Sequence, residues 1–378
     1  MAICTAEKFG SLRFADNDEA RLIADGILEN TDMLRFLKFF DLSVDNRLYV
    51  EKLGRIKTVD DFHKQIMVPI FEEIFEKTTD GITAENIDIL PNNDSVLFIS
   101  NHRDIVLDSG AMNLKLHQNG YGFGNPGIGD NLLMNEMIQS IFKMMKCFVI
   151  RRDLAGKEQV RFLKKLSGFI KHTITDYGES IWIAQSSGRA KDGNDKTNPA
   201  LLKMLTMAGQ ENAVEYLKSL HIHAVSCSFE WDPCDVFKVK ELMAKHNGEQ
   251  YVKDENEDLF SIRAGICGYK GRVHVVFNKV HDEELHKMHE FRSKDRFLYL
   301  ATLLDKKIMS GYRLWPSNYV AADLTCNTDI YADFYTAEER QMFIQRMVDG
   351  LGNKEKSGQA HNIFSSIYAN PVFNNEAL

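Results

Sequence analysis

Short apolar runs alternate with longer amphipathic segments through the middle of this chain. Runs of strand length occur at residues 95–100, 147–150, 180–184, 223–229 and 272–277. Apolar positions at helical spacing fill residues 131–146, 156–177 and 199–220, and the helical pattern resumes at 282–313. Strands that alternate with helices predict an α/β fold with a mostly buried mixed sheet flanked by helices.

The two ends of the chain have different patterns. Residues 17–80 carry clusters of apolar positions at helical spacing, which predict an N-terminal helical subdomain at 1–85. The α/β domain is expected at 86–350. Residues 351–378 are polar and rich in Asn, so we expect them to form a loosely ordered C-terminal tail.

Composition limits which cellular compartment and which partners can be expected for the protein. Of the 378 residues 44% are hydrophobic, which is enough for a sizeable core, and the six cysteines are scattered without a CxxC pair. This favours a reducing compartment. The chain has no secretory start and no apolar run that spans a bilayer, so we expect a cytoplasmic protein with peripheral contact to the inner face of the cell membrane at most. A net charge of −8 argues against nucleic acid as a partner.

The first apolar run ends in the polar segment Ser100–Asp108, in which His102 follows Asn101. Ligand sites in α/β sheets lie at the carboxyl ends of strands. A histidine there can act as a general base, and a nearby carboxylate can orient it. Residues six apart do not share a helix face, so a turn must bring Asp108 back to His102. A helix-capping Asn followed by ordinary surface charges is the alternative interpretation.

Two pairs of cations also follow predicted strands. Arg151 and Arg152 come directly after the second run, and Arg189 and Lys191 lie in the Ser/Gly turn with Gly188 after the third. The guanidinium group suits bidentate binding of phosphate, and backbone N–H groups of such a turn add to an anion site. Strand ends that converge at one sheet edge would place these four cations around one anion. The alternative is two pairs of solvated surface charges.

Residues Gly122–Gly127 match the GxGxxG pattern of dinucleotide-binding loops. The pattern before them, at Ala111–Gln118, is helical, and Pro126 lies inside the turn, so a glycine-rich structural loop is favoured. An NADP-binding oxidoreductase remains an alternative, and it requires a strand that runs directly into Gly122. No cofactor is predicted.

Two histidines and two cysteines lie close together in the sequence at His221, His223, Cys227 and Cys234. Their spacing fits no common closed zinc site. The sequence therefore predicts no metal site.

Taken in order, four segments resemble the blocks of the glycerolipid acyltransferase family, the glycerol-3-phosphate and 1-acylglycerol-3-phosphate acyltransferases with an NHx4D motif. The segments are Asn101–Asp108, Gly127–Arg152, Ile183–Arg189 and His223–Ser228. The third is most similar to the soluble plastid-type glycerol-3-phosphate acyltransferases. The resemblance covers roughly residues 90–235.

The chain departs from the family pattern in three places. Five residues rather than four separate His102 from Asp108, which leaves Asp104 as a second candidate for the carboxylate. The usual Pro-Glu-Gly of the third block is replaced by Gln185–Gly188, which removes a carboxylate. Ala224 stands where the fourth block has proline.

The resemblance implies an O-acyltransferase of phospholipid biosynthesis. The acyl donor would be acyl-CoA or acyl carrier protein, and the acceptor glycerol 3-phosphate or a lysophospholipid. His102 would be the general base, oriented by Asp108. The cations implied to bind the acceptor phosphate are Arg151, Arg152, Arg189 and Lys191, with Asn101 and Gly188 as supporting residues. A non-catalytic lipid- or carrier-binding protein is a further alternative, which thioester turnover would distinguish.

The helical segment at 131–150 carries more large apolar residues than one narrow helix face needs. A core helix is the favoured interpretation. The alternative is that part of its surface lines an acyl channel or meets the bilayer, where flexible methionines adapt to varied chains. Replacing Met137 and Phe142 distinguishes the two interpretations.

Overall fold

The computed structural model describes most of the chain. The described residues are 9–12, 14–29, 39–40, 46–92, 94–133, 135–209, 212–254, 256–292, 294–352 and 354–378. Residues 30–38 and 41–45, which belong to the predicted N-terminal helical region, lie outside them, as do Cys4 and Met134.

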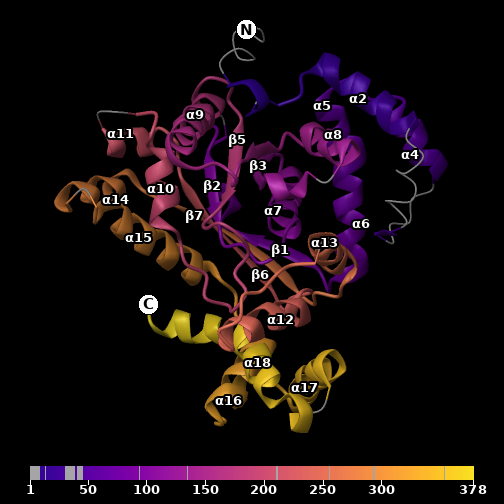
Figure 1. Cartoon of the computed structure of the whole chain (residues 1–378), viewed down its shortest axis with the longest axis vertical. Helices are drawn as coiled ribbons and strands as arrows, with labels where there is room; N and C mark the ends of the chain where they lie inside the picture. The colour runs from indigo at the N-terminus through magenta and orange to yellow at the C-terminus, as the bar shows by residue number, and fades with distance from the viewer. Residues whose placement is uncertain are drawn as a thin grey trace.

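One mixed sheet of seven strands lies at the centre of the molecule (Figure 1). The strands are β1 (Ile82–Glu85), β2 (Leu97–Ser100), β3 (Gly124–Gly129), β4 (Phe148–Ile150), β5 (Ser180–Ala184), β6 (His223–Phe229) and β7 (Val273–Lys279). Their order is β1-β7-β6-β2-β5-β3-β4, in which β6 and β7 pair antiparallel and the other neighbours pair in parallel. Strands β2 and β6 are buried along their whole length, and the predicted α/β fold with a mixed sheet is confirmed.

Helices cover both faces of the sheet. On one face lie α9 (Gly156–Thr175), α10 (Pro199–Leu205), α11 (Ala213–Lys218), α14 (Asp282–His286) and α15 (Arg296–Gly311). On the other lie α6 (Val68–Thr78), α7 (Leu107–Gln118) and α13 (Glu257–Cys267). Because successive strand residues point to opposite faces, Ile99 of β2 belongs to the first core and Phe98 to the second.

The N-terminal helices pack together beside the sheet. They are α2 (Asn17–Glu29), α4 (Asn46–Leu53) and α5 (Val59–Phe62), followed by a π-helical turn at His63–Met67 that leads into α6. They share a core with α8 (Glu136–Met144). Strand β1 lies within residues 1–85 but pairs with β7, so this region also contributes to the sheet. A domain boundary at residue 85 stays a prediction.

Short 3-10 segments complete the described elements. They lie at Gly10–Leu12, Ile87–Ile89, Asp130–Leu132, Lys287–Glu290 and Ala332–Phe334. No helix in the described part of the chain is both long enough and apolar enough to cross a membrane.

The Gly-rich stretch at 122–127 is not the predicted loop, because Gly124–Gly129 forms strand β3. Its glycines make room for aromatic neighbours: a Cβ on Gly127 would lie 2.7 Å from Cζ of Phe148. Helix α7, rather than a strand, precedes Gly122. The dinucleotide-binding fingerprint, and with it the NADP-binding alternative, is therefore wrong.

The last 25 residues are not the expected loosely ordered tail, since α18 (Lys354–Glu376) packs against α16 (Pro316–Cys326), α17 (Ala337–Leu351) and α12 (Asp235–His246). Figure 1 shows these helices gathered at the bottom of the molecule. Phe364, Ile367 and Tyr368 are buried in their shared core. The prediction failed because Asn and Ser lower the mean hydropathy of α18, although its few large apolar residues recur at helical spacing.

Packing of α18 can be tested with one substitution. We expect Phe364→Ala to lower the free energy of unfolding by about 3–5 kcal/mol, because it removes a fully buried ring. The matched control is Phe334→Ala, whose side chain is 56% exposed and which should change stability by no more than about 0.5 kcal/mol. Urea denaturation measures both. Equal effects for the two variants would contradict the packing of α18.

Candidate active site

A cleft of about 660 Å³ opens beside the carboxyl ends of β2, β3, β4 and β5. Because these four strands are parallel, the segments that follow them meet at the same sheet edge. The sequence-predicted residues that line the cleft are His102 after β2, Arg151 and Arg152 after β4, and Gly188, Arg189 and Lys191 after β5. The structure thus brings the histidine and all four cations to one cavity.

His102 and Asp108 form a hydrogen-bonded pair at this cleft. Nδ1 of His102 lies 2.9 Å from Oδ2 of Asp108, with the His side chain 15% exposed and the Asp side chain fully buried. Asp108 lies in the first turn of α7, where side chains tilt back toward the helix N-terminus. The same Oδ2 accepts the backbone N–H groups of Arg103 at 2.8 Å and Asp104 at 3.0 Å. With Nδ1 bound to Asp108, Nε2 is the ring nitrogen left for a ligand.

Asp104, the second candidate for the carboxylate, faces the start of α7. Its Oδ1 accepts the N–H groups of Val106 and Leu107, both at 2.9 Å, so it caps the helix. Burial raises the pKa of Asp104. The turn between His102 and α7 accommodates the additional residue relative to the family spacing, and Asp108 rather than Asp104 contacts the imidazole.

Asn101 ties the segment before His102 to strand β6. Its Nδ2 donates to the Cys227 carbonyl at 2.9 Å, and its Oδ1 accepts the Cys227 N–H at 2.8 Å. On the other side, Trp182 of β5 donates Nε1 to Oγ of Ser100 at 3.0 Å. The Trp182 ring lies edge-on to His102, with 5.9 Å between the centroids. Trp182 was not among the predicted site residues, although its position on a strand next to β2 would have been the signal.

Arg189 has a buried guanidinium nitrogen, Nη1, that forms no hydrogen bond with a described residue. Gly188 precedes it with φ +84°, a left-handed conformation that glycine adopts without strain. Arg152 lies over the end of β3, where a Cβ on Gly129 would come within 3.0 Å of its Cζ. Of the four predicted cations, Arg152 and Arg189 are the two that form no salt bridge with a carboxylate of the described residues.

The other two cations already have carboxylate partners. Lys191 forms an ion pair with Glu241 of α12, and burial lowers the pKa of Lys191. Arg151 binds Asp153 at 3.1 and 2.8 Å and is 44% exposed. The sequence analysis missed Glu241 because it predicted no helix at 235–246.

The remaining candidates do not gather at the cleft. His223 donates Nδ1 to the His221 carbonyl at 2.8 Å, and burial lowers its pKa to about 4. Cys227 and Cys234 donate Sγ to the backbone carbonyls of Asp108 and Ser261, at 3.5 and 3.3 Å. Within the described ranges no group of three or more His, Cys, Asp or Glu residues is arranged to hold a metal ion.

Comparisons with known proteins give little beyond the fold class. No protein-family model matches the chain, and no curated protein matches it. Among solved structures, the 1-acyl-sn-glycerophosphate acyltransferase PlsC from Thermotoga maritima aligns over 78% of this chain and 92% of that chain, with 13% identity and a TM-score of 0.40. Similarity at this level does not establish a shared function, so the geometry of the cleft has to carry the functional proposal.

Proposed function

We propose that the protein is a glycerolipid-type O-acyltransferase. It moves a fatty acyl group from acyl-CoA or acyl carrier protein to the hydroxyl of glycerol 3-phosphate or a lysophospholipid, a step of phospholipid biosynthesis. The observation that carries the proposal is the His102–Asp108 pair at the edge of a cleft that is also lined by Arg152 and Arg189. A base beside an anion site suits an acceptor that carries both a hydroxyl and a phosphate.

His102 acts as the general base in this mechanism. Asp108 holds the proton on Nδ1, which leaves Nε2 free to take the proton from the acceptor hydroxyl. The hydroxyl oxygen attacks the thioester carbonyl carbon as its proton moves to Nε2. The carbon–sulfur bond then breaks, and the imidazolium returns the proton to the leaving thiolate. The buried carboxylate stabilises the imidazolium between the two proton transfers.

The acceptor phosphate is held by the two guanidinium groups that lack a salt bridge, those of Arg189 and Arg152. Nη1 of Arg189 is buried and has no partner among the described residues, so an anion that reaches it gains a hydrogen bond without displacing an internal partner. Lys191 reaches the acceptor less readily, because Glu241 neutralises it. Arg151 is turned toward Asp153.

The acyl chain occupies an apolar cavity beside the cleft. This cavity measures about 150 Å³ and is enclosed by α2, α4, α6, α8, α13 and the turn before α6. The walls of the two spaces adjoin, since Ile105 lines the cleft and Val106 lines the cavity. Phe142 of α8 also lines the cavity, whereas Met137 is not part of its wall. The large apolar residues of 131–150 thus line the acyl cavity as well as packing in the core.

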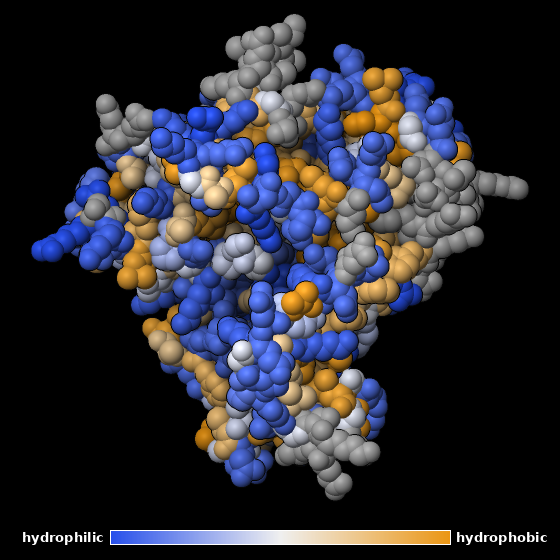
Figure 2. All heavy atoms as spheres, in the orientation of Figure 1, coloured by the Kyte–Doolittle hydropathy of each residue, from blue (hydrophilic) through white to orange (hydrophobic). Residues whose placement is uncertain are grey.

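The helices around this cavity also present hydrophobic side chains to the outside. Leu22 of α2 and Val50 of α4 are 72% and 51% exposed. Figure 2 shows hydrophobic surface in the upper right part of the molecule, where Figure 1 labels α2, α5 and α8. We propose that this side makes peripheral contact with the inner face of the cell membrane, from which a lipid acceptor enters the cleft.

His102→Ala is expected to lower kcat for acyl transfer by roughly 10²- to 10⁴-fold, because it removes the general base. Asp108→Asn should also be severe, since an amide no longer fixes the imidazole tautomer. Asp104→Asn should be milder, because Asp104 caps α7. Steady-state turnover measures all three variants. Near-wild-type turnover of His102→Ala would refute the mechanism, and a larger loss for Asp104→Asn than for Asp108→Asn would move the pair to Asp104.

Arg189→Ala is expected to raise the acceptor KM by roughly 10- to 150-fold, the equivalent of one charged hydrogen bond, with little change in the donor KM. Arg152→Ala should act in the same direction. Arg151→Ala is the matched control and should change the acceptor KM by less than about fivefold, because its exposed guanidinium is bound to Asp153. Unchanged acceptor KM values for both Arg152→Ala and Arg189→Ala would rule out the phosphate site.

Phe142→Ala is expected to shift the acyl preference toward longer chains, because removing the ring enlarges the cavity. The ratio of kcat/KM for a longer over a shorter acyl donor should rise roughly 10-fold. Met137→Ala, on the same helix but outside the cavity wall, should leave the ratio unchanged. A Phe142→Ala variant that loses stability with an unchanged ratio would mean that α8 is only a core helix.

A further inference from the structure

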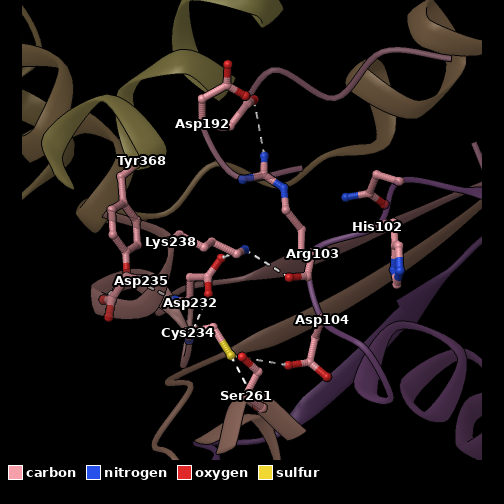
Figure 3. Close-up of polar contacts among 12 residues, drawn as sticks. His102, Arg103, Asp104, Asp192, Asp232, Cys234, Asp235, Lys238, Ser261 and Tyr368 are labelled. Carbon is pink, nitrogen blue, oxygen red and sulfur yellow. Dashed lines mark hydrogen bonds and ion pairs between the residues drawn. The ribbon is translucent and has the colours of Figure 1, made fainter. Parts of the chain in front are cut away.

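A chain of buried polar contacts links the residue after His102 to helices α12 and α18 (Figure 3). The Arg103 side chain is 6% exposed, and its Nε and Nη2 lie 2.8 and 2.6 Å from Oδ2 of Asp195. Its backbone carbonyl accepts a hydrogen bond of 2.8 Å from Nζ of Lys238. Arg103 is thus held through both its side chain and its backbone.

Lys238 comes from α12, 135 positions further along the chain than Arg103. Its side chain is 1% exposed, and its ammonium is paired with Asp232. Burial tends to raise the pKa of Asp232, but Lys238, the Cys234 N–H and Arg103 together lower the pKa below its usual value. Burying a charged pair costs free energy that a hydrophobic pair of similar size would avoid. Stability alone therefore does not account for a buried Lys that donates to the Arg103 carbonyl.

The segment that Lys238 holds is the one that orients the catalytic carboxylate. The N–H groups of Arg103 and Asp104 both donate to Oδ2 of Asp108, and the Arg103 carbonyl lies between these two amides along the backbone. The carbonyl and the Asp104 N–H belong to the same planar peptide group. Fixing the carbonyl therefore also fixes one of the donors to Asp108.

We propose that Lys238 is a positioning residue of the active site. By holding the Arg103–Asp104 peptide, it sets the orientation of Asp108 and through it the tautomer and direction of the His102 ring. This role rests on the proposed function, in which His102 must present Nε2 to the acceptor.

The same network supplies a matched control. Arg346 of α17 donates to Oδ2 of Asp235 at 2.7 Å and to the Asp232 carbonyl at 3.0 Å. Tyr368 of α18 also donates to Asp235, at 2.7 Å. Arg346 therefore fixes α12 to the C-terminal helices, and its hydrogen bonds go to Asp235 and Asp232 rather than to residues 102–108.

The kinetic test compares Lys238→Met with Arg346→Met in the full chain. Lys238→Met should lower kcat roughly 10- to 100-fold, the scale expected for a misplaced catalytic group, while both KM values stay within about threefold. The double variant Asp232→Asn/Lys238→Met leaves no unpaired buried charge, so it should recover thermal stability without recovering kcat. Arg346→Met should lose stability and keep its kcat. Wild-type kcat in the double variant, or an equal loss in Arg346→Met, would overturn the proposal.

A second readout does not depend on acyl transfer. The ¹⁵N chemical shifts of the His102 ring, assigned by their loss in His102→Ala, report which nitrogen carries the proton. We expect the proton on Nδ1 in the wild type and in Arg346→Met, and a mixture of tautomers in the double variant. An unchanged tautomer there would overturn the positioning role. A changed tautomer in a protein without acyl transfer would instead uphold the positioning role and refute only the proposed function.

Discussion

The hydrogen bond between His102 and Asp108 is the contact on which the site depends, and it exists only because the backbone between them is held in a tight turn. Residues six apart do not meet on a regular helix. The turn is fixed at its start by Asn101 against β6 and by the Ala190 N–H, which donates to the His102 carbonyl at 2.7 Å. It is fixed at its end by Asp104, which caps α7. Strand β6, the segment after β5 and helix α7 thus hold the backbone next to the imidazole, and Lys238 of α12 holds the Arg103 carbonyl within it.

The charges that line the cleft differ from the net charge of the chain. The chain carries a net charge of −8, yet five cations line the cleft together with His102. Three of them, Arg151, Lys191 and Lys253, are paired with carboxylates, whereas Arg152 and Arg189 form no salt bridge with a described residue. Elsewhere, buried acids are paired with Arg103, Lys238 and Arg346. The paired charges in the core neutralise each other at short range. A local anion site is therefore compatible with the net negative charge of the chain.

Sequence patterns predicted the strands that consist of a short, continuous apolar run. Strands β5 and β6 lie where short apolar runs predicted them, and the parallel order placed the residues after β2, β4 and β5 at one edge. Strand β3 was not predicted, because glycine and Pro126 have low strand propensity. Gly127 leaves room for the ring of Phe148, which a local pattern does not reveal. The roles of Lys238 and Glu241 were not predicted, because they depend on partners that are far away in the sequence. No local pattern encodes such contacts. The buried face of α18 was not predicted, because polar residues lower the mean hydropathy of this helix.

Acceptor-dependent release of thiol from an acyl thioester tests the central claim most directly. The purified chain is incubated with a long-chain acyl-CoA or acyl carrier protein, with glycerol 3-phosphate, a lysophospholipid, glycerol or no acceptor, and both thiol and lipid product are measured. The account predicts that thiol release requires an acceptor with a phosphate and equals the formation of acylated product, with little release for glycerol alone. Release at the same rate without acceptor, or no release with any of these pairs, would contradict it.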